Sequence, residues 1–259
     1  LPSMAIGRLP VRTTQDTDLM VGKILGYENT GQHGGALLVS DVSDDYNFAG
    51  ESLSVQPLIP AAMGTTTIDR GTDPTAESDL INGINQGQKI VNYAGHGSLD
   101  LWRGDLLTDS SALSLVNGQN LPFFSLMTCL NGAFNDPVLD SLAESLLKAP
   151  QGGAVAVWAS SGITDPSSQQ VMAQNFYKLL FGSSSTPGGG GNGGGNGGNG
   201  GGNGGNGGNG GNGGGGNGGG ATSGLTIGEA AARAKAGVPE LDVRTTWILF
   251  GDPAMRLKQ

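Results

Sequence analysis

The fold is decided by the run Leu121-Pro122-Phe123-Phe124-Ser125-Leu126-Met127, a strongly apolar stretch of strand length. A similar run, Lys89-Ile90-Val91-Asn92-Tyr93, precedes it, and a short helical pattern at residues 110–116 lies between the two. Strands that are apolar on both sides are typical of parallel sheets, because the helices of the crossover connections cover both faces. The two runs therefore predict neighbouring parallel strands joined by one helical crossover.

The same alternation of strand and helix patterns extends along most of the chain. Strand-like runs occupy residues 4–9, 36–40, 65–69, 153–158 and 244–250, and helical spacing occupies residues 75–85, 137–147, 169–181 and 227–236. Another helix is expected to begin near Asp16 or Thr17, whereas residues 52–63 are ambiguous because Pro57 and Pro60 interrupt a helix. We expect an α/β fold whose mostly parallel sheet is covered by helices on both faces.

A low-complexity insert divides this pattern. Of the 259 residues 49 are glycine, and residues 188–220 contain only Gly and Asn. Such a tract has no apolar side chains to bury, so we expect a disordered insert at residues 187–224. One domain would then be built from residues 1–186 and 225–259. The insert is either a tolerated surface loop, since lengthening a loop costs little entropy, or a spacer with an adhesive role.

Charge and composition exclude several classes of partner. The net charge of −9 argues against nucleic acid and anionic membrane surfaces, which require clustered Lys and Arg. No apolar run reaches the ~18 residues that a membrane-spanning helix needs. The single cysteine rules out an internal disulfide. Because the chain opens at Leu1 without a signal-like segment, we expect a fragment whose upstream part is absent.

The residues suited to chemistry follow the two central strands. His96 stands between Gly95 and Gly97 after the first strand, and Cys129 follows the second. Carboxyl ends of parallel strands meet at one edge of a sheet, so we expect the thiol and the imidazole to share that edge. The alternative is a cysteine buried as a small apolar residue and a histidine in a turn. His33, in a glycine-rich loop, is expected to be a surface residue.

Other chemistries find little support. Two histidines and one cysteine do not make a standard zinc site, and no phosphate loop or Gly-x-Ser-x-Gly elbow occurs. We therefore expect no cofactor and no catalytic metal. Structural calcium stays open. The stretch Asp41-x-Ser43-x-Asp45-x-Asn47 has the first ligand spacings of a calcium loop. It carries Tyr46 and Ser52, however, where that loop needs Gly and Glu.

Short motifs along most of the chain occur in the same order as in a known protein family. They are Gly7-Arg8-Leu9-Pro10-Val11-Arg12-Thr13, Lys23, Tyr27-Glu28, Val91-Asn92-Tyr93-Ala94-Gly95-His96-Gly97-Ser98, Trp102, Leu121-Pro122-Phe123, Thr128-Cys129-Leu130-Asn131-Gly132, Ala143-Glu144, Gly152-Gly153-Ala154-Val155-Ala156, Gly228 and Trp247-Ile248-Leu249-Phe250-Gly251-Asp252-Pro253. Together they resemble the gingipain-type cysteine peptidases of the caspase-like clan. The resemblance implies a caspase-like three-layer α/β/α sandwich, of which this chain covers the catalytic half, and a secreted or cell-surface location of bacterial type.

The resemblance also implies roles for individual residues. His96 and Cys129 would form the catalytic dyad and cleave protein or peptide substrates through an acyl-enzyme. The backbone amides of Gly97 and Cys129 would form the oxyanion hole. Asp41 falls where the family places an acidic residue near the histidine, so it would orient the imidazole.

The resemblance does not determine which substrate side chain the enzyme would prefer. Leu53 occupies the position of the acidic pocket residue in arginine-selective members. Asp44, Asp45 or Glu51 could replace that acid, or the preference could be non-basic. Trp158, with Ser160, is expected either to line a substrate pocket or to belong to the core.

Three functions are consistent with these patterns. The first is an exported cysteine endopeptidase. The second is a transpeptidase that cleaves sorting signals in a bacterial secretion system, which would use the same dyad with an amine in place of water. The third is a non-catalytic surface or adhesion module that retains the peptidase fold, and the intact dyad argues against it.

Overall fold

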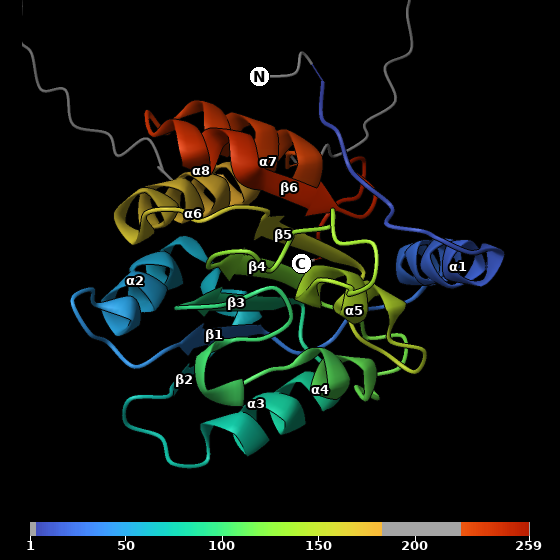
Figure 1. Cartoon of the computed structure of the whole chain (residues 1–259), viewed down its shortest axis with the longest axis horizontal. Helices are drawn as coiled ribbons and strands as arrows, with labels where there is room; N and C mark the ends of the chain where they lie inside the picture. Colours follow the sequence, from blue (N-terminus) through green and yellow to red (C-terminus); the bar gives the residue numbers. More distant parts are fainter. Residues whose placement is uncertain (1–3, 183–223, 259) are drawn as a thin grey trace, which may run out of the picture. The chain divides into compact units, whose positions relative to one another are not determined.

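A six-stranded sheet runs through the centre of the computed structural model, which describes residues 4–182 and 224–258 (Figure 1). The strands lie in the order β2-β1-β3-β4-β5-β6; β5 and β6 pair antiparallel and all other neighbours pair parallel. Their bounds are β1 Ala36–Ser40, β2 Thr65–Asp69, β3 Ile90–Ala94, β4 Phe123–Met127, β5 Ala156–Ser160 and β6 Trp247–Phe250. The predicted mostly parallel sheet is confirmed.

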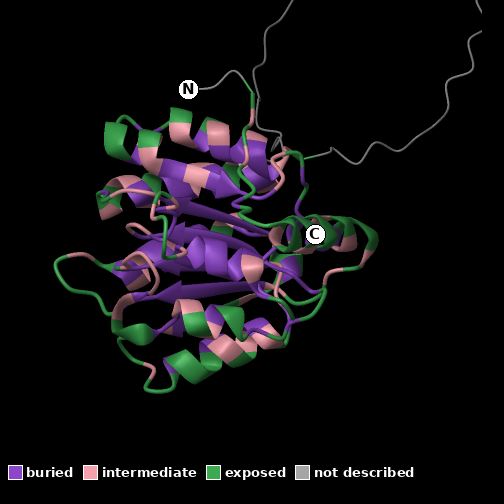
Figure 2. Ribbon diagram, turned by 45° about the vertical axis from the view of Figure 1, so that its right-hand side comes forward, coloured by how far each residue is buried: buried purple, intermediate pink, exposed green. Residues whose placement is uncertain are grey.

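Helices cover both faces of the sheet and make the three layers (Figure 2). One face packs against α2 (Phe48–Val55), α6 (Pro166–Phe181) and α7 (Ile227–Ala236). The other packs against α3 (Ala76–Asn85), α4 (Asp109–Leu113) and α5 (Leu142–Lys148). The remaining helices are α1 (Thr14–Asn29), α8 (Leu241–Thr246) and the 3₁₀ turns η1 (Gln56–Leu58), η2 (Ala61–Met63) and η3 (Arg103–Asp105).

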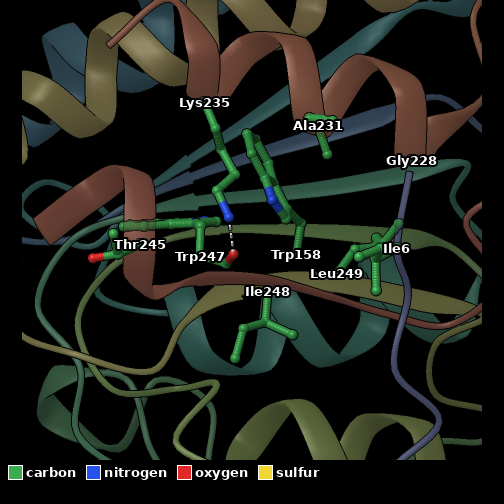
Figure 3. A pocket seen from close by; sticks show the side chains of 10 residues that line it. Ile6, Trp158, Gly228, Ala231, Lys235, Thr245, Trp247, Ile248 and Leu249 are labelled. Carbon is green, nitrogen blue, oxygen red and sulfur yellow. Dashed lines mark hydrogen bonds between the residues drawn. The ribbon is translucent and has the colours of Figure 1, made fainter. Parts of the chain in front are cut away.

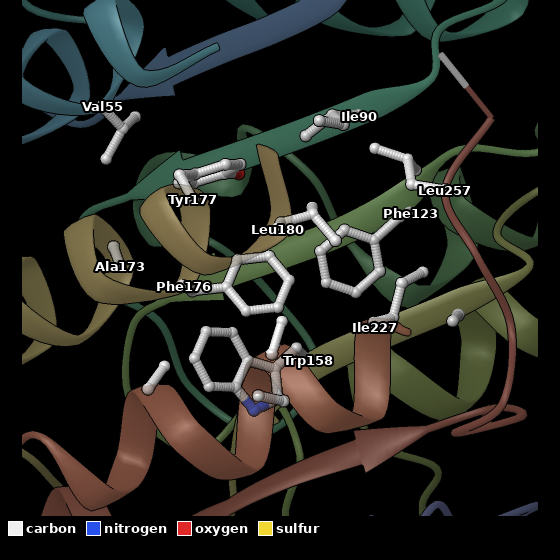
Figure 4. Packing of buried hydrophobic residues seen from close by; sticks show 14 of the residues in the cluster. Val55, Ile90, Phe123, Trp158, Ala173, Phe176, Tyr177, Leu180, Ile227 and Leu257 are labelled. Atoms are coloured by element: carbon white, nitrogen blue, oxygen red, sulfur yellow. The ribbon is translucent and has the colours of Figure 1, made fainter. Parts of the chain in front are cut away.

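Every residue of the four central strands is buried, which explains their continuous apolar character. Successive side chains point to opposite faces of a strand. In β5, Ala156 and Trp158 therefore join the hydrophobic cluster under α6 and α7, while Val157 and Ala159 join the cluster on the other face. Figure 4 shows Trp158 packed against Phe176 of α6, with ring centroids 4.7 Å apart.

Three expected elements differ from the sequence-based prediction. Residues 4–9 form no strand; only Arg8 bridges to Phe250 at the sheet edge. Residues 137–141 are not helical, because the Asp136 carboxylate accepts hydrogen bonds from the two N–H groups at residues 138 and 139 and turns the chain. Residues 244–246 end helix α8, so that the last extended segment begins only at residue 247.

The two stretches of chain on either side of the glycine-rich tract belong to one compact unit. Helix α6, before the tract, and helix α7, after it, pack together in a single hydrophobic cluster. The division into one domain of residues 1–186 and 225–259 stays a prediction. The expected insert at residues 187–224 lies outside the described residues, apart from its last position. Within residues 4–182 and 224–258, no helix combines the length and the apolar character required to cross a bilayer.

Replacing Phe176 by Ala should lower the free energy of unfolding by about 3–5 kcal/mol, because it removes a fully buried ring that contacts β4 and β5. Val171→Ala on the exposed side of the same helix is the matched control and should change stability by no more than ~0.5 kcal/mol. Urea unfolding of both variants measures the difference. Equal losses would contradict the packing described here.

Candidate active site

The pairing of β3 with β4 brings the histidine loop and the cysteine loop together. Ala94 and Met127 are register partners at the carboxyl ends of the two strands, and the N–H of Gly95 continues the ladder to the Met127 carbonyl at 3.2 Å. His96 lies two residues after Ala94, and Cys129 lies two residues after Met127. Since paired strands lie about 4.8 Å apart, both residues stand at the same edge of the sheet.

Cys129 is partly exposed, and its thiol is not buried in the core. Its Sγ lies against the main chain of Thr164, 3.5 Å from the amide nitrogen and 3.7 Å from the carbonyl oxygen. The chain turns sharply after the cysteine, where Leu130 adopts a left-handed conformation with φ of 63°. Such a conformation is costly for a residue with a side chain and persists only where surrounding contacts impose it, as at functional sites.

The two loops are tied to each other by direct contacts. The side-chain amide of Asn131 donates to the carbonyls of Ser98 and Leu101, at 2.5 and 3.3 Å. A Cβ added to Gly97 would lie 2.6 Å from Thr128 Oγ1, so only glycine permits this close approach. Within the described residues, the main-chain N–H groups of Gly97 and Cys129 donate no hydrogen bond.

The imidazole of His96 lies between an aromatic ring and a carboxylate. Phe48 meets it edge to face, with the ring centroids 5.0 Å apart, and Asp44 Oδ2 lies 3.0 Å from Nε2. The side chain of His96 is 46% exposed, so the ring is open to an incoming molecule.

Asp41 takes a different place from the one expected. Its fully buried carboxylate accepts the main-chain N–H of His96 at 3.2 Å and that of Val42 at 2.7 Å. It also forms ion pairs with Arg70 at 3.0 Å and with Arg103 at 2.7 Å. These four partners hold it beneath the histidine backbone, so the ring is contacted by Asp44 and not by Asp41.

Arg103 links both carboxylates. Besides its ion pair with Asp41, it places Nη1 2.8 Å from Asp44 Oδ2, the oxygen that also contacts His96. This guanidinium, with a smaller contribution from the Tyr46 N–H, lowers the pKa of Asp44 to about 2. Asp44 therefore stays ionised throughout the neutral range.

The acidic residues that could receive a basic substrate side chain are mostly engaged or hidden. Burial raises the pKa of Glu51 to about 8, Asp165 contributes in the same direction, and neither carboxylate oxygen has a hydrogen bond within the described residues. Glu51 is therefore largely neutral at pH 7. Leu53, two residues further along α2, has half of its surface in solvent. Asp45 and Asp165 are exposed.

Trp158 and Ser160 are core residues in this structure. Both have no exposed surface, because they face the layer formed by α6 and α7. Trp158 contributes to the wall of a cavity of about 250 Å³, together with Ile6, Lys235 and Trp247 (Figure 3). Neither His96 nor Cys129 lines that cavity. Ser160 bonds to Thr246 and to the carbonyl of Gly162, which braces the segment leading to Thr164.

The residues present do not fit the calcium loop considered from sequence. Asp41 is committed to two arginines, and the Asn47 side chain caps the first turn of α2 through the Gly50 N–H. Across the described parts of the chain, no group of three or more His, Cys, Asp or Glu is arranged to hold a metal ion.

Sequence reasoning did not assign the parts played by Asp44 and Arg103. It considered Asp44 only as a substrate-pocket residue, and it did not single out Arg103. Their positions in the sequence could have indicated these roles. Asp44 follows β1 and Arg103 follows β3, so both lie in loops at the same edge of the sheet as His96. His33 is exposed, as expected from the sequence, and its main chain bonds to the Asn120 side chain.

Comparison with known proteins supplies a family and a fold. The model of peptidase family C25 matches residues 1–195, about three quarters of the chain. Gingipain R2 and gingipain R1 of Porphyromonas gingivalis are both 33% identical over 103 residues, or 38% of this chain. The crystal structure of the Arg-specific cysteine proteinase gingipain R superposes with a TM-score of 0.74 and 18% identity, covering 98% of this chain. This similarity confirms the fold class implied by the resemblance.

The chain spans only part of these proteins. The alignments cover 14% of gingipain R2 and 10% of gingipain R1, and 55% of the solved gingipain R chain. A further solved structure, described as a protease, covers 97% of this chain with a TM-score of 0.68 and 14% identity, and 55% of its own length is matched.

Glu51→Gln should remove a pH dependence of stability. The folded-state pKa of about 8 lies above the ordinary value of 4.5, so the folded protein binds the extra proton between these pH values. The stability of the parent protein should fall as pH rises through this window, by up to ~1.4 kcal/mol per pH unit. The variant should lack this slope and become relatively more stable towards pH 8.

Thermal or urea unfolding at several pH values from 4 to 9 measures the effect. Glu77→Gln, which changes an exposed glutamate on α3, is the matched control and should preserve the slope. A Glu51→Gln profile parallel to the parent's would show that this carboxyl is not protonated in the folded state.

Proposed function

Since the chain belongs to peptidase family C25, we propose that it is a cysteine endopeptidase that hydrolyses proteins or peptides through His96 and Cys129. The observation that carries the proposal is the shared register of the two residues, each two positions beyond paired residues of β3 and β4. The partly exposed thiol and the open imidazole add to it.

The chemistry divides into two steps. His96 takes the thiol proton, and the thiolate of Cys129 attacks the carbonyl carbon of the scissile bond. The tetrahedral intermediate collapses to a thioester when the amine leaves with the proton from the imidazolium. Water then attacks the thioester with His96 as base, releasing the new carboxylate and restoring the thiol.

The developing oxyanion needs donors that are not otherwise engaged. The N–H groups of Gly97 and Cys129 meet this requirement within the described residues, and they come from the two loops that Asn131 ties together. We assign the oxyanion hole to this pair. Donors fixed before the reaction stabilise the charge without reorganisation, which is why losing one typically costs ~2.7–4 kcal/mol.

A secreted or cell-surface location completes the proposal. It rests on the resemblance to an exported family and not on a feature of the described residues. Fractionation of the producing cells, with an antibody against this chain, would contradict the location if the protein stayed entirely in the cytoplasm.

Cys129→Ala and His96→Ala should each lower peptidase activity at least about a thousandfold, because each removes a group that every turnover uses. Cleavage of fluorescein-labelled casein and of a peptide library measures the loss. His33→Ala changes the other histidine and should leave activity within twofold. Activity retained by Cys129→Ala would refute the proposed function, and products joined to an added amine would indicate transfer in place of hydrolysis.

Gly97→Ala should lower kcat about a hundredfold with little change in KM, because the new Cβ would lie 2.6 Å from Thr128 Oγ1 and displace the oxyanion donor. Thr128→Ala removes the obstructing oxygen. The double variant Gly97→Ala/Thr128→Ala should therefore recover part of the lost kcat. A Gly97→Ala enzyme with wild-type kcat would exclude the Gly97 amide from the oxyanion hole.

A further inference from the structure

We propose that Arg103 is a positioning residue that holds Asp44 against the imidazole of His96, so that Asp44 orients the catalytic ring. The proposal rests on the proposed function of His96. It assigns roles to two residues of this chain whose part in the site follows only from their three-dimensional contacts.

Arg103 connects the histidine loop to the loop between β1 and α2. Its main-chain N–H donates to the His96 carbonyl at 2.9 Å, which fixes its backbone beside the histidine. Its guanidinium reaches across to three acceptors on the other loop: Asp41 Oδ2 at 2.7 Å, Asp44 Oδ2 at 2.8 Å and the Val42 carbonyl. One side chain therefore fixes the spacing between the ring and the carboxylate that contacts it.

Asp44 needs such support because it stands on the surface. Its side chain is 40% exposed, and the local turn holds it only through hydrogen bonds with the main chain of Tyr46, at 3.1 and 3.2 Å. An exposed carboxylate and imidazole attract each other weakly in water, and two flexible side chains lose entropy when they pair. The planar guanidinium of Arg103 binds three acceptors and fixes the position of the Asp44 carboxylate. It therefore reduces the entropy that Asp44 loses when it pairs with the imidazole.

Asp41, which binds Arg103, is itself held in place by several contacts. Asp41 is fully buried and already accepts two main-chain N–H groups, so its carboxylate has little freedom to move. Arg70 binds its other oxygen at 3.0 Å. The ion pairs that reach the ring thus connect Asp41, Asp44, Arg70 and Arg103, whose formal charges sum to zero. The guanidinium is engaged at Nε, Nη1 and Nη2, which favours a structural role over capture of substrate.

The contact at Nε2 also decides which nitrogen acts as base. Asp44 is ionised and can only accept a hydrogen bond, so the neutral ring must carry its proton on Nε2. The basic lone pair is then on Nδ1, the atom left to take the proton of Cys129. When the ring becomes protonated, the nearby carboxylate stabilises its positive charge. Arg103 thus acts through Asp44 on both the orientation and the charge of the ring.

The test compares Asp44→Asn, Arg103→Lys, Arg103→Gln and the double variant Asp44→Asn/Arg103→Gln. Arg103→Lys keeps the charge but cannot bridge three acceptors, so we expect kcat/KM to fall about tenfold in it as in the other single variants. The double variant should be no worse than Asp44→Asn alone, because the two residues act as one unit. Labelled casein and any peptide cleaved by the parent protein serve as substrates.

The pH profile separates positioning from a general loss of stability. In Asp44→Asn the acidic limb of kcat/KM should move to lower pH, since the ring that takes the thiol proton has lost the carboxylate that favours its protonated form. Arg103→Lys, which keeps the positive charge but loosens Asp44, should move it in the same direction. Alkylation of Cys129 by iodoacetamide at pH 6 gives a second readout that needs no substrate, and it should slow in all four variants.

Arg12→Lys is the matched control, because Arg12 has similar exposure and also bridges several acceptors, but at Asp136 and Asp140. It should leave both profiles unchanged. A wild-type profile in Arg103→Lys, or losses that simply add in the double variant, would overturn the inference. Cys129→Ala measured in parallel distinguishes the cases: if it is inactive while Arg103→Lys is normal, only the positioning role fails.

Discussion

The pairing of β3 with β4 is the interaction on which the rest of the site depends. Because Ala94 and Met127 are register partners, the two loops that follow leave the sheet side by side. A slip of one residue would turn every side chain of one strand to the opposite face and disrupt the packing of the two hydrophobic clusters. The register is therefore fixed by burial, with both strands covered on both faces. The stability of the core and the placement of the reactive groups have the same cause.

The body of the sheet is apolar, but two carboxyl groups are buried at its edge. Burying a charged carboxylate is unfavourable, and the chain compensates for it in two different ways. Asp41 has no exposed surface but is matched by two guanidiniums and two main-chain N–H groups, so its charge is compensated. Glu51 is equally buried without such partners, and burial shifts its pKa upward until it is largely neutral. These two buried carboxyl groups thus add very little uncompensated negative charge, although the chain as a whole carries a net charge of −9.

Contacts between loops complete the site. Asn131 joins the cysteine turn to the histidine loop, and Arg103 joins the histidine loop to the residues after β1. These bonds join residues that follow three different strands, so each loop is held by its neighbours as well as by hydrogen bonds of its own. Such mutual support is what allows Leu130 to keep a left-handed backbone beside the thiol.

The sequence by itself determined the central strands, the helices on both faces and the placement of His96 and Cys129 at one edge, because apolar runs are local signals and parallel strands share their carboxyl end. Only the tertiary structure decided which carboxylate meets the imidazole. Asp41 and Asp44 are three residues apart in one loop, and their separation from Arg103 along the chain leaves no local pattern to distinguish them. It also decided that Trp158 belongs to the core, since the face it occupies becomes buried only when α6 and α7, separated by the glycine-rich tract, pack together over it. Packing between distant segments follows from the whole set of contacts, which no short stretch of sequence contains.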